Sequence, residues 1–170
     1  MPRNVEIKAR VVDPERLETK VREITNGDPS LIEQDDTFFN CETGRLKLRK
    51  FSEAQGELIF YRRADDSGPK ESFYVISRTA EPDSLRETLE LAYGSSGRVI
   101  KRRLLYFVGR TRIHLDRVQN LGDFLELEVV LEDHELPDHG VTEARRILAQ
   151  LDVEDAQLIQ GAYVDLLMQN

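Results

Sequence analysis

The sequence predicts an α+β fold, an eight-stranded antiparallel β-barrel with flanking α-helices. Short segments in which charged and apolar residues alternate recur along the chain, and a period of two is typical of β-strands. Helical patterns separate groups of these strands, but the regular strand–helix alternation of a parallel sheet is not evident. Because 170 residues fit one domain, we expect residues 1–170 to form a single unit.

Five strands and a first helix are predicted in the first half of the chain. The strands span residues 3–12, 34–40, 44–51, 57–63 and 71–79. The helix begins at Pro14, places Leu17 and Val21 on one face and ends near Gly27. The segment 65–69, of sequence DDSGP, is the clearest loop.

Three further strands and three helices are predicted in the second half. A helix begins at Pro82 and is stopped by the glycine-containing segment 94–97. The remaining strands span residues 99–109, 111–118 and 122–132, and the remaining helices span residues 141–151 and 162–168. His134 and His139 resemble a zinc motif, but their spacing is one residue too long and Pro137 would interrupt a helix, so we predict no zinc site.

Composition and charge exclude several classes of function. The net charge is −8 and the sequence pI is near 5.0, which argues against binding along a nucleic-acid backbone. No apolar run approaches the roughly 20 residues that a membrane helix needs. The chain enters a strand directly, without an apolar signal segment, so we expect a cytoplasmic protein that binds neither nucleic acid nor membranes. The single cysteine, Cys41, is interpreted as an ordinary thiol.

Charged residues fall on one face of several predicted strands. They occupy alternate positions in the segments 6–10, 45–49, 112–116 and 126–128. A hydrated face on a one-sided sheet is one interpretation of this pattern. If the sheet closes instead, these faces meet in an interior that eight strands make just wide enough for one small ligand. Cations and carboxylates gathered there would form a site for a polyanion and a metal ion.

The pair Glu126 and Glu128 is the first candidate for metal binding. Carboxylates at positions i and i+2 of a strand point to the same side and suit hard ions such as Mg²⁺ or Mn²⁺, with Glu6 as a third ligand. The alternative is that these carboxylates only balance neighbouring arginines. His114 is expected to be a hydrogen-bonded structural residue. The sequence contains no P-loop, GxSxG elbow or GxGxxG turn, which excludes the enzyme classes that depend on them.

Several segments of the chain carry a family resemblance. They are Asn4–Arg10 (NVEIKAR), Asp36–Phe39 (DTFF) leading to Gly44–Arg49 (GRLKLR), Tyr106–Gly109 (YFVG) and Leu121–Glu128 (LGDFLELE). In order and spacing these segments resemble the CYTH superfamily, the triphosphate tunnel metalloenzymes, and most closely its branch of class IV adenylyl cyclases and triphosphatases. The resemblance covers almost the whole chain. It implies a single tunnel domain in which cations grip a triphosphate and acidic residues hold Mg²⁺ or Mn²⁺.

The resemblance also implies roles for particular residues. The phosphate-binding positions correspond to Lys8, Arg10, Lys47, Arg49, Arg63, Lys101, Arg103 and Arg112. The metal ligands correspond to Glu6, Glu126 and Glu128, with Asp116 as an alternative, and the catalytic set comprises Glu6, Lys8, Glu126 and Glu128. The chain departs from the family pattern at Asn4, where the first acid of the signature is expected, and at Ala162, where relatives often have serine before Tyr163.

Three reactions remain open at this point. Hydrolysis of inorganic tripolyphosphate, or of a small organic or nucleoside triphosphate, needs only the tunnel and a metal-activated water. An adenylyl cyclase that converts ATP to cyclic AMP and pyrophosphate also needs a nucleoside pocket, and no residue can be assigned to one. A protein that only binds polyphosphate or nucleotide is the third alternative, because Asn4 replaces an acid. We favour the metal-dependent triphosphatase, a monomer or homodimer whose partner is a triphosphate-containing small molecule.

Overall fold

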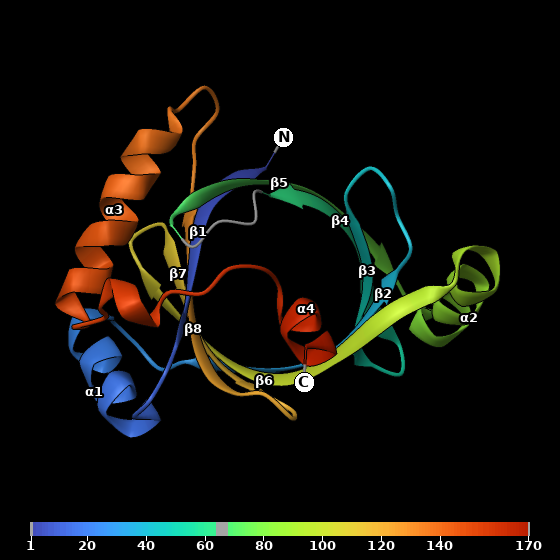
Figure 1. The fold of residues 1–170 in the computed structure, drawn as a ribbon, viewed down its shortest axis with the longest axis horizontal. Helices are drawn as coiled ribbons and strands as arrows, with labels where there is room; N and C mark the ends of the chain where they lie inside the picture. The colour runs from blue at the N-terminus through green and yellow to red at the C-terminus, as the bar shows by residue number, and fades with distance from the viewer. Residues whose placement is uncertain (1, 64–67, 170) are drawn as a thin grey trace.

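The computed structural model describes residues 2–63 and 68–169. Within these ranges, eight strands form a closed antiparallel barrel with the neighbour order β1-β5-β4-β3-β2-β6-β7-β8, which confirms the predicted fold class (Figure 1). The strands are β1 (Arg3–Arg10), β2 (Ser30–Phe39), β3 (Arg45–Ser52), β4 (Gln55–Arg63), β5 (Lys70–Thr79), β6 (Ser95–Val108), β7 (Thr111–Val118) and β8 (Gly122–Val130). Most of the loop predicted at 65–69 lies outside the described residues.

Two strands are longer than the sequence pattern predicts. β2 begins at Ser30 rather than at residue 34, and β6 begins at Ser95 rather than at residue 99. These strands pair with each other from Ser30 opposite Leu105 to Phe39 opposite Ser95. Cross-strand hydrogen bonds therefore extend both strands through residues that show no alternation. Gly94, with a φ of 77°, ends the preceding helix immediately before β6 begins.

Three helices pack on the outside of the barrel. α1 (Pro14–Ile24) and α3 (Pro137–Gln150) lie on one side, beside β1, β7 and β8, and α2 (Pro82–Tyr93) packs against β2 and β3 on the other (Figure 1). α3 begins at Pro137 rather than at residue 141, and it does not extend back to His134, as expected from the proline. Pro137 occupies the first turn of α3, where its missing N–H removes no intrahelical hydrogen bond. None of the helices in the described ranges is long and apolar enough to cross a lipid bilayer.

The largest hydrophobic core lies between the barrel wall and the helices on one side, rather than inside the barrel. On β1, Val5, Ile7 and Ala9 point outward into this core and are at most 2% exposed. Glu6 and Lys8, which alternate with them, face the interior. Because successive side chains point to opposite faces of a strand, the outward residues supply the packing and the inward positions remain available for charge.

A short helix near the C-terminus closes one end of the barrel. α4 (Tyr163–Met168) appears within the outline of the barrel in Figure 1. This helix and the residue before it pack against the ends of several strands through Phe38, Ile59, Tyr61, Val99, Val118, Phe124, Ala162, Tyr163 and Val164. Gly97 allows this close approach, because a Cβ there would overlap Val164 Cγ2. The interior is therefore a cup with a closed end at α4 and an open end opposite it.

Candidate functional site

The interior of the barrel is a cavity of about 460 Å³ lined by inward-facing residues of every strand. Its cationic lining residues outnumber its carboxylates. The cations are Lys8, Lys47, Arg49, Arg63, Lys101, Arg103 and Arg112, and the carboxylates are Glu6, Asp36, Glu57, Glu126 and Glu128. The volume and the surplus of positive charge suit one small polyanion.

Arg10 is the one predicted phosphate-binding residue that the structure separates from this cavity. It is the last residue of β1, it is exposed, and it is not among the lining residues. Its guanidinium carbon lies 5.3 Å from the centre of the Phe124 ring. Phe124 is 1% exposed and packs against Tyr163 at the closed end. Strand alternation predicts the face of Arg10 correctly, but it does not predict how far along the strand the cavity extends.

Asp36 on β2 gathers three cations from β3 and β6. Its carboxylate accepts hydrogen bonds from Arg49 Nε at 2.8 Å and from Arg49 Nη2 at 2.7 Å. Lys47 Nζ lies 3.2 Å and Lys101 Nζ lies 3.6 Å from Asp36 Oδ2. Burial at 1% exposure opposes ionisation, but these cations hold the pKa of Asp36 well below its usual range. We call Asp36, Lys47, Arg49 and Lys101 the Asp36 cluster.

The lysines of the Asp36 cluster are not fully compensated by its single carboxylate. Burial and the charge of Arg49 lower the pKa of Lys47 to about 8. Burial and the charge of Arg103 lower the pKa of Lys101 well below its usual range. A bound polyanion would favour the charged form of both lysines. The cluster therefore presents a preformed cationic surface that gains from an added anion.

Asp116 belongs to a second buried network, which extends to the closed end. Arg103 Nε and Nη2 each donate to its carboxylate at 2.7 Å, and Tyr163 Oη donates to its Oδ2 at 2.8 Å. Burial opposes ionisation of Asp116, but Arg103 lowers its pKa to about 2. Both carboxylate oxygens accept these hydrogen bonds and Asp116 is not among the residues that line the cavity, so its role as the alternative metal ligand stays a prediction. The Tyr163 ring also lies 3.9 Å from Lys8 Nζ, a cation–π contact.

His114, Glu126 and Glu128 form the group in this cavity that is best suited to a metal ion. One ligand atom from each lies within 4.8 Å of the others. His114 Nδ1 is 3.5 Å from Glu126 Oε1 and 3.4 Å from Glu128 Oε1, yet this buried atom makes no hydrogen bond within the described part of the chain. Burial and the charge of Arg103 lower the pKa of His114 to about 4, so the imidazole is neutral near pH 7. We call these residues the His114 group.

The fit of a divalent cation to the His114 group rests on two features. The first is the position of His114 Nδ1 between the two carboxylates, 3.5 Å from Glu126 Oε1 and 3.4 Å from Glu128 Oε1. The second is the proximity of the two carboxylates, since burial and the charge of Glu126 raise the pKa of Glu128 to about 8. Asn4, which replaces the first acid of the family signature, lies beside this group: its Nδ2 donates to Glu128 Oε2 at 3.2 Å. An amide adds no charge to the site.

Glu6 is not part of the His114 group in this structure. Arg63 Nη1 donates to Glu6 Oε1 at 2.6 Å, which holds the carboxylate beside β4. Arg63 lines the cavity, whereas Arg62 donates to the backbone carbonyl of Thr43. The interior position predicted for Arg63 therefore agrees with the geometry. The role of Glu6 as a direct metal ligand stays a prediction.

Sequence reasoning missed the roles of Asp36, His114 and Tyr163. Asp36 lies opposite Arg49 in the pairing of β2 with β3. The sequence signal for its role is an acidic residue at an inward-facing position of a predicted strand. Alternation puts His114 on the same strand face as Arg112 and Asp116, but its position between two carboxylates depends on the pairing of β7 with β8. Tyr163 reaches the cavity only because α4 closes the barrel, and no local pattern shows this.

The chain is similar to proteins of one family across nearly its whole length. A family model described as the CYTH domain matches residues 2–163. An adenylate cyclase CyaB from Aeromonas hydrophila is 32% identical over 81 residues, which cover 47% of this chain and 42% of that relative. The match therefore spans less than half the length of this curated relative.

Two solved structures illustrate the likeness in fold. A protein from Pyrococcus horikoshii has a TM-score of 0.84 at 23% identity, with 96% of this chain and 98% of that chain covered. A putative adenylyl cyclase from Hippeastrum, described as having a dominant triphosphatase activity, has a TM-score of 0.69 at 13% identity, with 99% and 95% covered. These identities support the fold alone. The match of the family model over residues 2–163, together with the closed barrel and its charged interior, shows that the chain belongs to the CYTH domain family.

Proposed function

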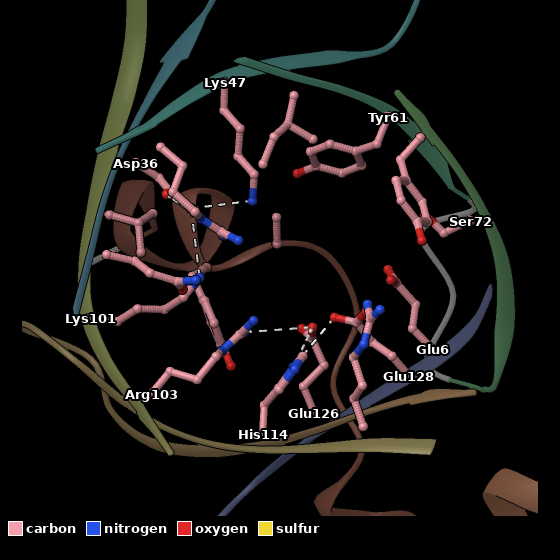
Figure 2. Close-up of a pocket in the computed structure, with 18 of the residues that line it drawn as sticks. Glu6, Asp36, Lys47, Tyr61, Ser72, Lys101, Arg103, His114, Glu126 and Glu128 are labelled. Carbon is pink, nitrogen blue, oxygen red and sulfur yellow. Dashed lines mark hydrogen bonds and ion pairs between the residues drawn. The ribbon is translucent and has the colours of Figure 1, made fainter. Parts of the chain in front are cut away.

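We propose that this protein is a divalent-metal-dependent triphosphatase that cleaves the terminal phosphoanhydride bond of a triphosphate bound in the cavity. The observation that carries the proposal is that the Asp36 cluster and the His114 group share one cavity. Figure 2 shows them on opposite sides of the interior, so a ligand lying between them contacts both. Phosphoryl transfer depends mainly on positioning and electrostatic stabilisation, which cations and a metal ion supply.

Two arginines are oriented for phosphate binding by buried aspartates. Arg49 uses Nε and Nη2 to bind Asp36, and Arg103 uses the same atoms to bind Asp116. The Nη1 groups of both arginines make no hydrogen bond to the residues that the structure describes, so they are available to phosphate oxygens. Because one edge of each guanidinium is already fixed, less side-chain freedom is lost when phosphate binds.

The His114 group would hold the metal ion through the two carboxylates and the imidazole nitrogen between them. When bound, Mg²⁺ or Mn²⁺ neutralises phosphate charge and lowers the pKa of a coordinated water. In hydrolysis a water oxygen bonds to the terminal phosphorus, the bond to the bridging oxygen breaks, and orthophosphate, the diphosphate product and a proton are released. Lys8 Nζ lies 3.4 Å from Glu126 Oε2 and adds a further cation to the cavity, which would stabilise negative charge developing on the phosphates.

A second candidate function is favoured by the partial match to an adenylate cyclase. In that reaction the ribose 3′-oxygen bonds to the α-phosphorus of ATP and pyrophosphate leaves. The same cations would hold the phosphates, but the nucleoside would have to be folded back onto its own phosphate chain. A binding protein without turnover is the third candidate, because Asn4 provides an amide where the signature has an acid.

Product analysis with the purified protein separates these candidates. Tripolyphosphate or ATP is incubated with Mg²⁺ or Mn²⁺, and orthophosphate, cyclic AMP and pyrophosphate are measured. We expect orthophosphate without cyclic AMP. Cyclic AMP with pyrophosphate would establish the cyclase instead, and tight binding without product would establish the binding protein.

The pair Arg49→Ala and Arg10→Ala provides a matched control for the cavity. Arg49 faces the interior, whereas Arg10 is exposed beyond the closed end. We expect Arg49→Ala to raise the KM for a triphosphate about tenfold or more, which corresponds to the loss of one charge-assisted hydrogen bond. Arg10→Ala is expected to leave the KM unchanged.

A further inference from the structure

A second pocket lies outside the barrel, between α1 and the outer wall of the sheet. Its volume is about 280 Å³, and none of the described residues lines both this pocket and the barrel interior. The residues that define it are Leu17 of α1, Leu31, Arg102, Leu104, Leu115 and Arg117. We call this pocket the outer groove. Its size is at the lower end of the range for ligand sites, so it suits one small molecule.

The floor of the outer groove is apolar. Leu31 on β2 lies opposite Leu104 on β6, and Leu104 lies opposite Leu115 on β7, so three leucines form a row across the wall. Leu17 of α1 lines the pocket beside this row. Leu104 and Leu115 are only half-buried, and Leu31 is 54% exposed. This surface gains free energy when the apolar part of a ligand covers it.

A row of charged residues runs beside the leucines, two positions further along the same strands. Arg102 on β6 lies directly opposite Arg117 on β7, and their side chains are 63% and 71% exposed. Like charges in this position repel each other. Each arginine has an acidic partner on its far side: Arg102 Nε lies 3.6 Å from Glu33 Oε1, and Arg117 Nε donates to Asp123 Oδ1 at 3.1 Å. Among the described residues, the Nη groups of both arginines have no hydrogen-bond partner.

The carboxylates that line the outer groove are already paired. Glu18 accepts hydrogen bonds from Tyr106 Oη at 2.8 Å and from Arg22 Nη2 at 3.0 Å. Asp116 belongs to the buried network inside the barrel, and Asp123 accepts its hydrogen bond from one of the two arginines. The charged row therefore has the order acid, arginine, arginine, acid. One negative charge fits between the arginines, whereas a second would be repelled by the flanking acids.

We propose that the outer groove binds a small amphipathic carboxylate, whose carboxylate group lies between Arg102 and Arg117 and whose apolar part covers the three leucines. Guanidinium N–H groups form charge-assisted hydrogen bonds with a carboxylate, which neither arginine has fully made within the protein. A terminal phosphate fits less well, because it carries a second negative charge near neutral pH. This site is separate from the barrel interior, so the inference does not depend on the reaction proposed there.

The first test is a set of equilibrium titrations of the unmodified protein, monitored calorimetrically. Octanoate is the probe, because it joins one carboxylate to a short apolar chain. We expect one octanoate to bind per chain. Octanol lacks the charge and acetate lacks the chain, so each should bind at least about tenfold more weakly. Octyl phosphate at pH 8, where it is a dianion, should bind no more tightly than octanoate.

The second test uses single substitutions in the outer groove. Arg102→Ala and Arg117→Ala should each weaken octanoate binding about tenfold, which corresponds to the loss of one charge-assisted hydrogen bond. Arg98→Ala is the matched control, because Arg98 is a 56% exposed arginine on the same strand as Arg102 but lies outside the groove. It should leave the affinity unchanged. Leu31→Ser should weaken octanoate binding severalfold without changing acetate binding.

Denaturant unfolding checks that the variants fold. Neither Arg102→Ala nor Arg117→Ala should be markedly destabilised, because each change also removes a repulsion between like charges. Absence of octanoate binding, or binding that both substitutions leave unchanged, would overturn the proposal. Tighter binding of octyl phosphate than of octanoate would overturn the assignment of the ligand as a carboxylate.

Discussion

The two sides of the cavity differ in how completely their charges are paired. In the Asp36 cluster, a buried carboxylate contacts three cations and its pKa is strongly lowered. In the His114 group, Nδ1 of the histidine lies between two carboxylates, and burial and the charge of Glu126 raise the pKa of Glu128 to about 8. Figure 2 shows the cluster on one side of the interior and the group on the other. One side thus holds a single carboxylate among three cations, whereas the other holds two carboxylates that repel each other although Lys8, Arg103 and Arg112 lie near them.

This difference indicates which side binds which part of a substrate complex. The Asp36 cluster has an excess of cations and fixed side chains, so it suits phosphate oxygens without prior rearrangement. The His114 group has closely spaced carboxylates and an imidazole nitrogen between them, so it suits a divalent cation. Substitutions on the two sides should therefore affect different properties: folding on the first side and metal dependence on the second.

The largest effect is expected for Asp36→Asn. This change leaves Arg49, Lys47 and Lys101 buried without their carboxylate partner, which should lower the free energy of unfolding by about 3 to 5 kcal/mol. Denaturant unfolding of the ligand-free protein measures it. Tripolyphosphate should restore part of the loss, because it supplies negative charge at the same place.

Asp35→Asn is the matched control for this prediction. Asp35 is the neighbouring residue of β2. It pairs with Arg98, which is 56% exposed, and lies 3.6 Å from Arg86 Nη2. A surface ion pair contributes less than about 1 kcal/mol, so this control should change stability little. Equal destabilisation by the two substitutions would show that the Asp36 cluster is not a special buried network.

The next effect is expected for Glu126→Gln. The amide keeps the shape but removes one charge from the His114 group, so turnover should fall by about a hundredfold or more because metal binding is weakened. Stability without metal should fall less than in Asp36→Asn, because the lost contacts of Glu126 with Lys8 and Arg103 are partly offset by relief of the repulsion of Glu128. Turnover and the metal concentration for half-maximal activity measure the first effect, and unfolding measures the second. Unchanged turnover would remove Glu126 from the metal site.

Much of the fold could be predicted because strand alternation is a local property. The run from Glu6 to Arg10 shows its charged face without any knowledge of its neighbours. The depth of the cavity is different, because it depends on where α4 meets Phe124 and Val99. For this reason Lys8 was correctly placed inside and Arg10 was not.

The candidate site was harder to predict where a contact depends on strand register. Glu126 and Glu128 are two positions apart, so their shared face was readable from the sequence. The contact of His114 with both of them requires the pairing of β7 with β8, and the ion pair of Glu6 with Arg63 requires the closed barrel. A rule of two-residue alternation contains no such information.

A smaller effect is expected for His114→Ala. An imidazole nitrogen is a better ligand for Mn²⁺ than for Mg²⁺, which prefers oxygen. Removal of this ligand should weaken Mn²⁺ binding about tenfold, a magnitude typical for the loss of one supporting metal contact, and weaken Mg²⁺ binding less. Titration of the purified variant with each metal, monitored calorimetrically, measures both affinities without turnover. Equal weakening of the two metals would show that His114 acts only through packing.

The smallest effect is expected from the titration of Lys47 in the Asp36 cluster. Its pKa is lowered to about 8, mainly by burial and by Arg49, against the attraction of Asp36. Arg103 also faces it, and the Tyr61 ring lies 5.3 Å from its Nζ. The charged form binds phosphate, so affinity for a triphosphate should be greatest below pH 8 and should fall severalfold as the pH rises through 8 and the lysine loses its proton.

The variant Lys47→Arg isolates this titration, because arginine stays charged throughout the same range. The decrease in affinity between about pH 7 and pH 9 should be smaller in the variant than in the unmodified protein, whatever the variant's absolute affinity. The measurement is the equilibrium affinity for tripolyphosphate without metal, which avoids any contribution from a metal-bound water. An identical pH dependence in both proteins would assign the titration to a group outside the Asp36 cluster. In that case the Asp36 cluster would keep its full positive charge up to pH 9. The difference in charge between the Asp36 cluster and the His114 group would then be larger than the lowered pKa of Lys47 implies.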